Sequence, residues 1–273
     1  MSVSTSSSSP IFQQRTVLAP SSQVSARVCG EGPPIVLFHS LLADDSSFDP
    51  IAAPLTASHQ VVILNLPGFG ESVAVDGGLE AIADRIAAAI AAFEFATPPI
   101  FLGNGYGGFI ALLTAIRHPG IAAKLVLADC GAAFSEPGRA AFRGMSAAAL
   151  ANGLAAIADV AMRRLFAPEF QAENPALIAE RRERFLAVDP KVFHAACLAL
   201  STLDVRDQLH AVKVPVLVLV GEHDEATPPV MSEELARLLP HAELKILAGC
   251  AHVPQLQEPK LFMGAIETFL GRS

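Results

Sequence analysis

Short apolar runs that alternate with helix-like stretches constrain the fold of this chain more than any other feature of its sequence. Six such runs lie at residues 35–38, 61–64, 100–102, 125–128, 216–220 and 244–247. Apart from Lys245, each run is apolar throughout, which is typical of strands that helices cover on both faces. Strands and helices in alternation predict a parallel sheet. Two earlier runs, at 16–18 and 24–29 around Pro20, predict an antiparallel hairpin before this sheet.

The stretches between the runs predict the helices and a separate helical insertion. Helices are expected at residues 79–93, 106–117, 231–239 and 260–270. No strand signal occurs at 131–209, where Ala, Arg and Leu recur at helical spacing, for example at 174–188. We therefore predict a helical cap at 131–209, inserted after the sixth strand, and a core formed by 11–130 and 210–273. Because ligands bind at the carboxyl ends of the strands in open α/β sheets, this cap is expected to cover a binding site.

Length and hydropathy indicate a globular protein. The 273 residues, 52% of them hydrophobic, suffice for one large α/β domain. No apolar run reaches the roughly 18 residues of a membrane-spanning helix. The serine-rich residues 1–10 have neither a charged start nor an apolar stretch, so they predict a disordered tail and not a secretion signal. We therefore expect a soluble, cytoplasmic protein.

Charge and cysteine usage limit the partners. The formal net charge is -8 and no basic run occurs, which argues against binding to nucleic acid or to an anionic membrane. The 4 cysteines are widely spaced without a CxxC pair, so we expect reduced thiols and neither disulfides nor a zinc site. A small molecule is the expected partner, and no metal or cofactor is expected.

A glycine-rich turn joins the run at 100–102 to the helix that follows it. Residues 100–109 read I-F-L-G-N-G-Y-G-G-F. In the G-x-S-x-G elbow, small residues let a strand and a helix approach closely around a strained turn that presents a nucleophilic serine. Here Gly105 stands at the central position, and glycine adopts the positive φ of such a turn without strain. A phosphate-binding loop is the competing interpretation, but the chain has neither G-x-x-x-x-G-K nor a dinucleotide fingerprint.

An acid and a base follow the last two apolar runs. Asp224 ends the sequence G-E-H-D after 216–220, and His252 ends the sequence G-C-A-H after 244–247. Since neighbouring parallel strands end at one edge of a sheet, both side chains are expected beside the elbow, with Asp224 orienting the imidazole. Each residue alone has an ordinary structural interpretation, as a surface Asp or a partly buried His. Their order after the elbow, however, is that of the triads carried by α/β hydrolases.

The remaining site residues are expected around this elbow. The backbone amide of Tyr106 and one amide of the loop after 35–38, for which we select Leu41, are expected to form an oxyanion hole. The substrate pocket is expected to include four further residues, namely His39, Ser40, Asn104 and Cys130. We interpret His39 and Ser40 as turn residues hydrogen-bonded to the backbone more than as catalytic groups. The thiols of Cys130 and Cys250 are considered as substitute nucleophiles, but buried thiols are usually inert.

Together these blocks resemble the 3-oxoadipate enol-lactonase branch of the α/β-hydrolases. The similar features are His39-Ser40-Leu41 with Asp44, the loop at 65–72, the elbow, the cap segments at 164–170 and 203–206, and the blocks that hold Asp224 and His252. The resemblance implies an α/β-hydrolase fold: a mostly parallel eight-stranded sheet, helices on both faces and a helical cap after strand 6. It also implies hydrolysis of a small carboxylic ester or lactone. Three departures are Gly105 in place of serine, Asn65 in place of aspartate, and the lack of a cap tryptophan.

Three functional hypotheses follow from Gly105. The first is an ester or lactone hydrolase impaired by an engineered or natural loss of its nucleophile, a loss that typically costs about 10⁶ in kcat. The second is a serine-free enzyme in which His252 and Asp224 form a general base for a water, held in the space of the missing serine, or for a carbon acid. The third is a non-catalytic binder of a small molecule. Retention of the acid and the base favours the two enzymatic hypotheses.

Overall fold

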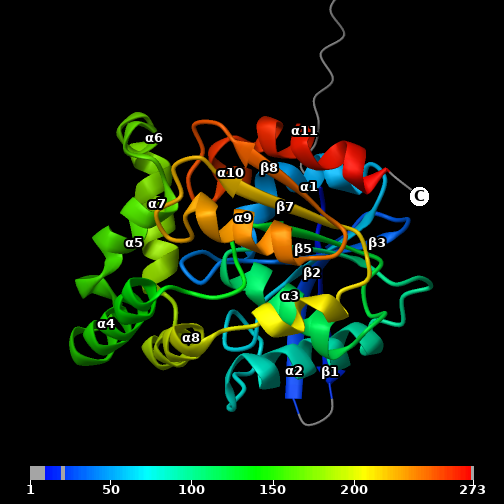
Figure 1. Ribbon diagram of the computed structural model, residues 1–273, viewed down its shortest axis with the longest axis horizontal. Coiled ribbons are helices and arrows are strands. Elements are labelled where there is room, and N and C mark those ends of the chain that lie inside the picture. The colour runs from blue at the N-terminus through cyan, green and yellow to red at the C-terminus, as the bar shows by residue number, and fades with distance from the viewer. Residues whose placement is uncertain (1–9, 20–21, 272–273) are drawn as a thin grey trace, which may run out of the picture.

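The fold is built on one eight-stranded sheet. The computed structural model describes residues 10–19 and 22–271, so the predicted tail lies, apart from Pro10, outside the described residues. The strands are β1 Gln13–Ala19, β2 Ser22–Cys29, β3 Pro34–Phe38, β4 Gln60–Leu64, β5 Ile100–Asn104, β6 Lys124–Ala128, β7 Val216–Gly221 and β8 Ala242–Leu247. They are arranged in the order β1-β2-β4-β3-β5-β6-β7-β8 (Figure 1). β3 to β8 pair in parallel, while β1 and β2 form an antiparallel hairpin that adds to β4. The predicted sheet and its opening hairpin are confirmed.

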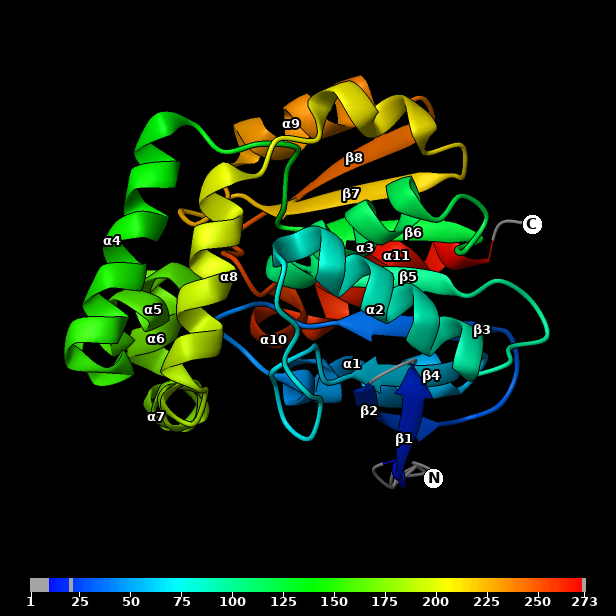
Figure 2. The same ribbon diagram turned by 90° about the horizontal axis from the view of Figure 1, so that it is seen from below.

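Helices cover both faces of the sheet. The α-helices of the core are α1 Asp49–Thr56, α2 Gly78–Ala92, α3 Tyr106–Arg117, α9 Pro229–Leu238, α10 Pro254–Gln257 and α11 Pro259–Leu270, and the 3-10 helices are η1 Asp45–Phe48 and η3 Arg206–Ala211. Figures 1 and 2 show α2 and α3 on one face and α1 and α11 on the other. Along β3, Val36 and Phe38 pack toward α2 and α3, whereas Ile35 and Leu37 pack toward α1 and α11. Both sets of strand side chains are therefore buried, which explains the uninterrupted apolar runs.

β8 is an exception to the prediction that helices cover each strand on both faces. It is the last strand of the sheet, and most of its residues are partly or fully exposed, with Ile246 49% exposed. The side chain of Lys245 donates a hydrogen bond to the carbonyl oxygen of Ala265 in α11 (2.6 Å). The apolar run at 244–247 thus belongs to an edge strand with one open side, where a charged side chain can reach water or a helix end.

The chain between β6 and β7 forms the helical cap. Its helices are α4 Glu136–Asn152, η2 Leu154–Ala156, α5 Ala158–Leu165, α6 Pro168–Glu173, α7 Pro175–Leu186 and α8 Pro190–Thr202. In both views these helices gather at one end of the sheet (Figures 1 and 2). The two ends of the insertion meet in an antiparallel β-bridge between Ala133 and Asp204. Next to it, the Val205 amide donates a hydrogen bond to the Ala132 carbonyl oxygen (2.9 Å). No helix within the described ranges is long and apolar enough to cross a membrane.

Candidate active site

The elbow between β5 and α3 is a tight turn that requires glycine at more than one position. Gly105 has φ +54° and ψ −119°, in the positive-φ region that glycine adopts most easily. Its neighbours must be small: a Cβ on Gly103 would lie 2.5 Å from the Gly107 carbonyl oxygen, and a Cβ on Gly107 would lie 2.1 Å from that of Phe38. The structure therefore has the strand, turn and helix of a nucleophile elbow, with no side chain at its apex.

His252 and Asp224 form a buried pair beside this elbow. The imidazole Nδ1 lies 2.9 Å from Asp224 Oδ2, and the two residues are 4% and 3% exposed. Asp224 also accepts hydrogen bonds from the amides of Ala226 (2.8 Å) and Thr227 (3.0 Å) and from the Thr227 hydroxyl (2.6 Å). These donors fix the carboxylate, which in turn accepts a hydrogen bond from the Nδ1–H group of His252. In the neutral imidazole the lone pair then lies on Nε2, which faces the elbow.

Ser40 occupies the space in front of the imidazole. Its Oγ lies 3.3 Å from His252 Nε2. A Cβ built on Gly105 would lie 2.6 Å from that nitrogen and 2.6 Å from Ser40 Oγ. The space predicted to hold a water in place of the missing serine is thus filled by the Ser40 hydroxyl. Interpreting Ser40 as a turn residue missed this contact, because 212 positions separate it from His252.

A narrow, mostly apolar cavity opens on these groups. It offers about 30 Å³ to the centres of water molecules, enough for about two of them. Its lining comes from the core and from cap helices α4, α5 and α8, and consists of Ser40, Leu41, Leu42, Gly105, Tyr106, Phe109, Phe134, Phe142, Met145, Arg164, Leu200, Ala226, Thr227 and His252. Such a shape, apolar with few polar groups, is typical of sites for small organic ligands.

Two backbone amides are available on this lining. Leu41 and Tyr106, which the sequence predicted as oxyanion donors, both line the cavity. Tyr106 opens α3, where an amide has no partner within its own helix. Neither amide has a hydrogen-bond acceptor in the described part of the chain. Both amides therefore stay candidates for binding a negatively charged oxygen in the cavity.

His39, predicted in the pocket, lies behind the cavity wall instead. It is fully buried and does not line the cavity. Its Nε2 accepts the amide of Leu66 (3.2 Å), so its Nδ1 carries the proton that bonds the Ser40 carbonyl (2.9 Å). Burial lowers the pKa of His39, which keeps the ring neutral. The ring thereby fixes the backbone of Ser40.

Asn104, the second residue wrongly placed in the pocket, is a buried connector. Its Nδ2 donates to the His252 carbonyl (2.8 Å) and to Asp129 Oδ2 (3.0 Å), and its Oδ1 accepts from Gln255 Nε2 (3.1 Å). It is absent from the cavity lining. Asn104 is the last residue of the buried strand β5 and directly precedes the apex of the turn, and its side chain holds the loop that carries His252.

The two cysteines considered as nucleophiles, Cys130 and Cys250, do not line the cavity either. Cys130 does not line the cavity, contrary to the prediction, because its side chain packs under α3, where a Cβ on Gly108 would lie 2.9 Å from Sγ. Burial raises the pKa of the Cys130 thiol, and burial also raises that of Cys250 to about 12. Thiols in such environments remain protonated and unreactive. Neither replaces the missing serine.

Asp129 is a buried acid that the sequence prediction overlooked. It follows β6 directly, has φ +53°, and accepts the Gly221 amide (2.8 Å) as well as Asn104 Nδ2. Burial and the nearby charge of Asp224 raise the pKa of Asp129 well above its ordinary value. An acidic residue directly after a buried central strand was the signal in the sequence.

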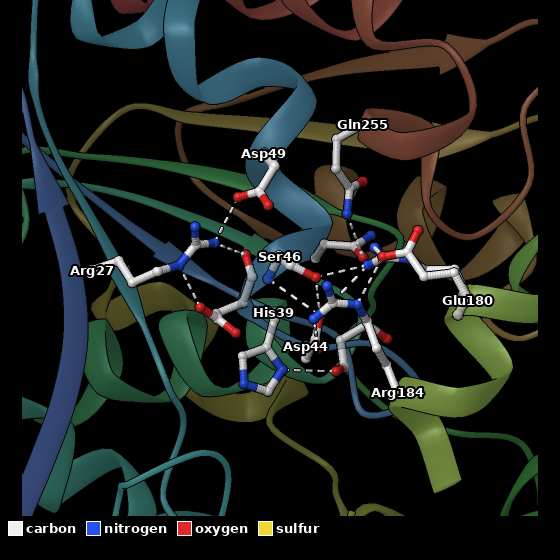
Figure 3. A network of polar contacts seen from close by, with 12 residues as sticks. Arg27, His39, Asp44, Ser46, Asp49, Glu180, Arg184 and Gln255 are labelled. Atoms are coloured by element: carbon white, nitrogen blue, oxygen red, sulfur yellow. Dashed lines mark hydrogen bonds and ion pairs between the residues drawn. The ribbon is translucent and has the colours of Figure 1, made fainter. Parts of the chain in front are cut away.

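Charged residues join the cap to the core close to this site (Figure 3). Asp44, just before η1, lies 3.0 Å from Arg184 Nη1 and 3.5 Å from Arg181 Nη1, both on α7. Arg181 is only 5% exposed and also donates to Ser46 Oγ (2.9 Å). Burial opposes ionisation of Asp44, but the Ser46 hydrogen bond and the Arg184 charge prevail and lower its pKa. We call this set the cap latch: Asp44, Ser46, Arg181 and Arg184.

No metal centre accompanies the site. Among the residues that the structure describes, no group of three or more His, Cys, Asp or Glu side chains is placed to hold a metal ion. The arrangement is instead an oriented imidazole, a hydroxyl and two amide donors around an apolar cavity. These are the parts that acyl transfer requires.

The fold and this arrangement define an α/β hydrolase. Residues 35–265 match the model of the alpha/beta hydrolase family, and the chain belongs to that family.

Its relatives include esterases and lactonases. A pimeloyl-[acyl-carrier protein] methyl ester esterase of Vibrio atlanticus (strain LGP32) is 28% identical over 255 residues, 89% of this chain and 96% of that protein. The 3-oxoadipate enol-lactonase 2 of Acinetobacter baylyi (strain ATCC 33305 / BD413 / ADP1) is 27% identical over 172 residues, 63% of each chain. The solved enol-lactonase from Burkholderia xenovorans LB400 has a TM-score of 0.88 at 25% identity, covering 94% of this chain and 100% of that one. The predicted resemblance to enol-lactonases is confirmed.

Proposed function

We propose that this chain hydrolyses small carboxylic esters or lactones by acyl transfer to water, with His252 as the proton acceptor. The observation that carries the proposal is the buried Asp224–His252 pair, whose Nε2 faces an apolar cavity beside the amides of Leu41 and Tyr106. A pocket that only binds a ligand does not require an imidazole that a carboxylate orients. The names of the relatives, methyl ester esterase and enol-lactonase, support the same reaction class.

The proposed chemistry uses the groups on the cavity wall. A hydroxyl attacks the carbonyl carbon while Nε2 takes its proton, and Asp224 stabilises the imidazolium that forms. The developing oxyanion is bound by the two amides, each typically worth about 3 kcal/mol of transition-state stabilisation. Since Gly105 brings no hydroxyl, this activity is impaired relative to a triad with serine at the elbow.

The lining limits the proposed substrate. Most of its side chains are aliphatic or phenyl groups, which suits a short apolar acyl or alkyl part. Arg164 brings a guanidinium to the wall from α5 and makes no ion pair within the described residues. A small ester or lactone with a carboxylate at its far end fits this combination of charge and shape.

The test is hydrolysis by the purified chain compared with His252→Ala. A panel of aryl esters and lactones with short acyl chains, some of them carrying a carboxylate, should give slow turnover that His252→Ala abolishes. His210→Ala is the matched control, because His210 is exposed and bonds only the Asp207 carbonyl. Turnover that survives in His252→Ala would contradict the proposal. If the unmodified chain turned over no member of the panel but bound one of them tightly, the result would also contradict the proposal and would support a binding protein.

A further inference from the structure

Among the described residues, the Ser40 hydroxyl is the side-chain group that lies within hydrogen-bond distance of His252 Nε2. Ser40 Oγ lies 3.3 Å from His252 Nε2. Ser40 lines the cavity and is 1% exposed. Building on the proposed function, we infer that Ser40 is the nucleophile, so that the triad is Ser40, His252 and Asp224. In this triad the attacking serine lies on the loop that follows β3 and not at the elbow.

The loop geometry leaves the Ser40 hydroxyl to the imidazole. The Ser40 carbonyl accepts from His39 Nδ1 (2.9 Å) and from the Ala43 amide (3.3 Å), so its backbone is held on both sides. Within the described chain, His252 is the hydrogen-bond partner of Ser40 Oγ. A hydroxyl that is fixed at its base and donates to an oriented imidazole has the arrangement of an activated nucleophile.

With glycine at the elbow, no side chain at position 105 stands beside Ser40 and His252. A Cβ on Gly105 would lie 2.6 Å from Ser40 Oγ and 3.1 Å from Ser40 Cβ. A side chain at 105 would therefore require Ser40 to shift from its present position. The contact between Ser40 Oγ and His252 Nε2 in this structure thus depends on glycine at 105.

The two expected oxyanion donors keep their roles when Ser40, and not a serine at the elbow, is the nucleophile. In the elbow arrangement, one donor is the amide of the residue after the nucleophile. Leu41 stands in that position relative to Ser40, and Tyr106 supplies a second amide across the cavity. An acyl group on Ser40 Oγ thus meets the same pair of donors.

The reaction then balances in two halves. Ser40 Oγ bonds to the carbonyl carbon and its proton passes to His252 Nε2. Collapse of the tetrahedral intermediate breaks the bond to the leaving alkoxide, which takes the proton from Nε2 and leaves an acyl-Ser40 ester. A water then gives its proton to Nε2 and attacks this ester, and the Ser40 oxygen leaves with that proton as the carboxylic acid forms.

The test is to find where a serine-directed fluorophosphonate becomes attached. Ser40 Oγ should displace fluoride, and peptide mapping of the unmodified full chain should place one phosphonyl group on Ser40. Ser40→Ala should lose this adduct and slow ester hydrolysis by at least about 100-fold. Ser146→Ala is the matched control, since Ser146 also contacts a histidine, His194 (2.5 Å), but does not line the cavity. It should keep both the adduct and the rate.

The outcomes separate this inference from the function on which it rests. Hydrolysis that survives Ser40→Ala but not His252→Ala would overturn the inference and leave the proposed function intact, with water as the attacking group. An adduct on another residue would also overturn it. If the unmodified chain shows no hydrolysis and forms no adduct, both the inference and the proposed function are overturned. Because the adduct is mapped on the unmodified chain, a Ser40→Ala variant that fails to fold does not decide the question.

Discussion

At the scale of residues, the site depends on which side chain fills the space in front of His252. Replacing Gly105 by Ser restores the elbow motif in the sequence but not in space, because the new Cβ would lie 2.6 Å from both His252 Nε2 and Ser40 Oγ. The positive φ of +54° adds strain of about 1–3 kcal/mol for a non-glycine residue. We therefore expect Gly105→Ser alone to be destabilised and poorly active.

Removing the Ser40 side chain should rescue that variant. In Ser40→Gly with Gly105→Ser, the serine at the elbow gains the space beside Nε2, and hydrolysis should exceed that of Ser40→Gly alone by at least about 100-fold. Ser40→Gly with Gly105→Ala is the control, since it adds the Cβ without the hydroxyl and should stay inactive. Kinetics and urea unfolding of the four variants and the parent give the coupling between the two positions. Additive effects would show that the side chains do not compete.

The sequence was informative about the residues that follow strands and uninformative about their neighbours in space. Asp224 and His252 each follow an apolar run, so their meeting at one edge of the sheet was predictable. Asn104 ends β5 and Cys130 follows β6, yet neither side chain reaches the cavity, because both pack beneath the elbow and α3. Which side chain at a strand end faces the cavity is decided by packing, which no local pattern encodes.

At the scale of elements, the sequence predicted the long helices of the core and missed α1 and α10. The predicted helix at 106–117 coincides with α3, which is apolar apart from Thr114 and Arg117 and ends near Pro119. α1 was not predicted, because Pro54 lies inside it and proline lacks the amide that a helix interior needs. It forms because Ile51 and Leu55 are fully buried against the sheet, each contributing about 1.5–3 kcal/mol.

The cap latch gives α7 a pH-dependent attachment to the core. Since the pKa of Asp44 is lowered in the folded chain, its contribution to stability is present above the ordinary aspartate pKa of about 4 and is lost as the pH falls through the folded value. Asp44→Asn should thus lower the free energy of unfolding by roughly 1–3 kcal/mol at pH 7, and by progressively less below pH of about 4. Urea unfolding at several pH values measures this difference.

Hydrogen exchange should locate the effect of that substitution in the cap. Asp45→Asn is the matched control, because Asp45 pairs with Arg27 of β2 (2.5 Å) and so joins two parts of the core. Asp44→Asn should speed amide exchange in α7, whereas Asp45→Asn should not. Equal exchange of α7 in both variants would mean that apolar packing, and not the latch, holds the cap.

At the scale of the whole molecule, function depends on two bodies of chain that close upon one cavity. The core presents Ser40, Gly105 and His252, while the cap supplies Phe142 and Arg164. The sequence predicted the insertion after the sixth strand, but the seating of a cap is set by long-range contacts such as Asp44 with Arg184, 140 positions apart. How closely the cap packs on the core, and hence the size of the cavity between them, could not be predicted from the sequence.

The cavity has room for about two water molecules, so we expect the cap to shift when an ester with an acyl chain of several carbons enters. The latch anchors α7, on which α5 with Arg164 packs, so weakening it lowers the free-energy cost of opening. The kcat/KM of Asp44→Asn for a hexanoyl ester, relative to that for the acetyl ester, should then rise by about fivefold for each roughly 1 kcal/mol of lost attachment. Asp45→Asn should leave this ratio unchanged. A ratio that stays constant in Asp44→Asn would place the entrance away from α7, on the side of α4 and α8.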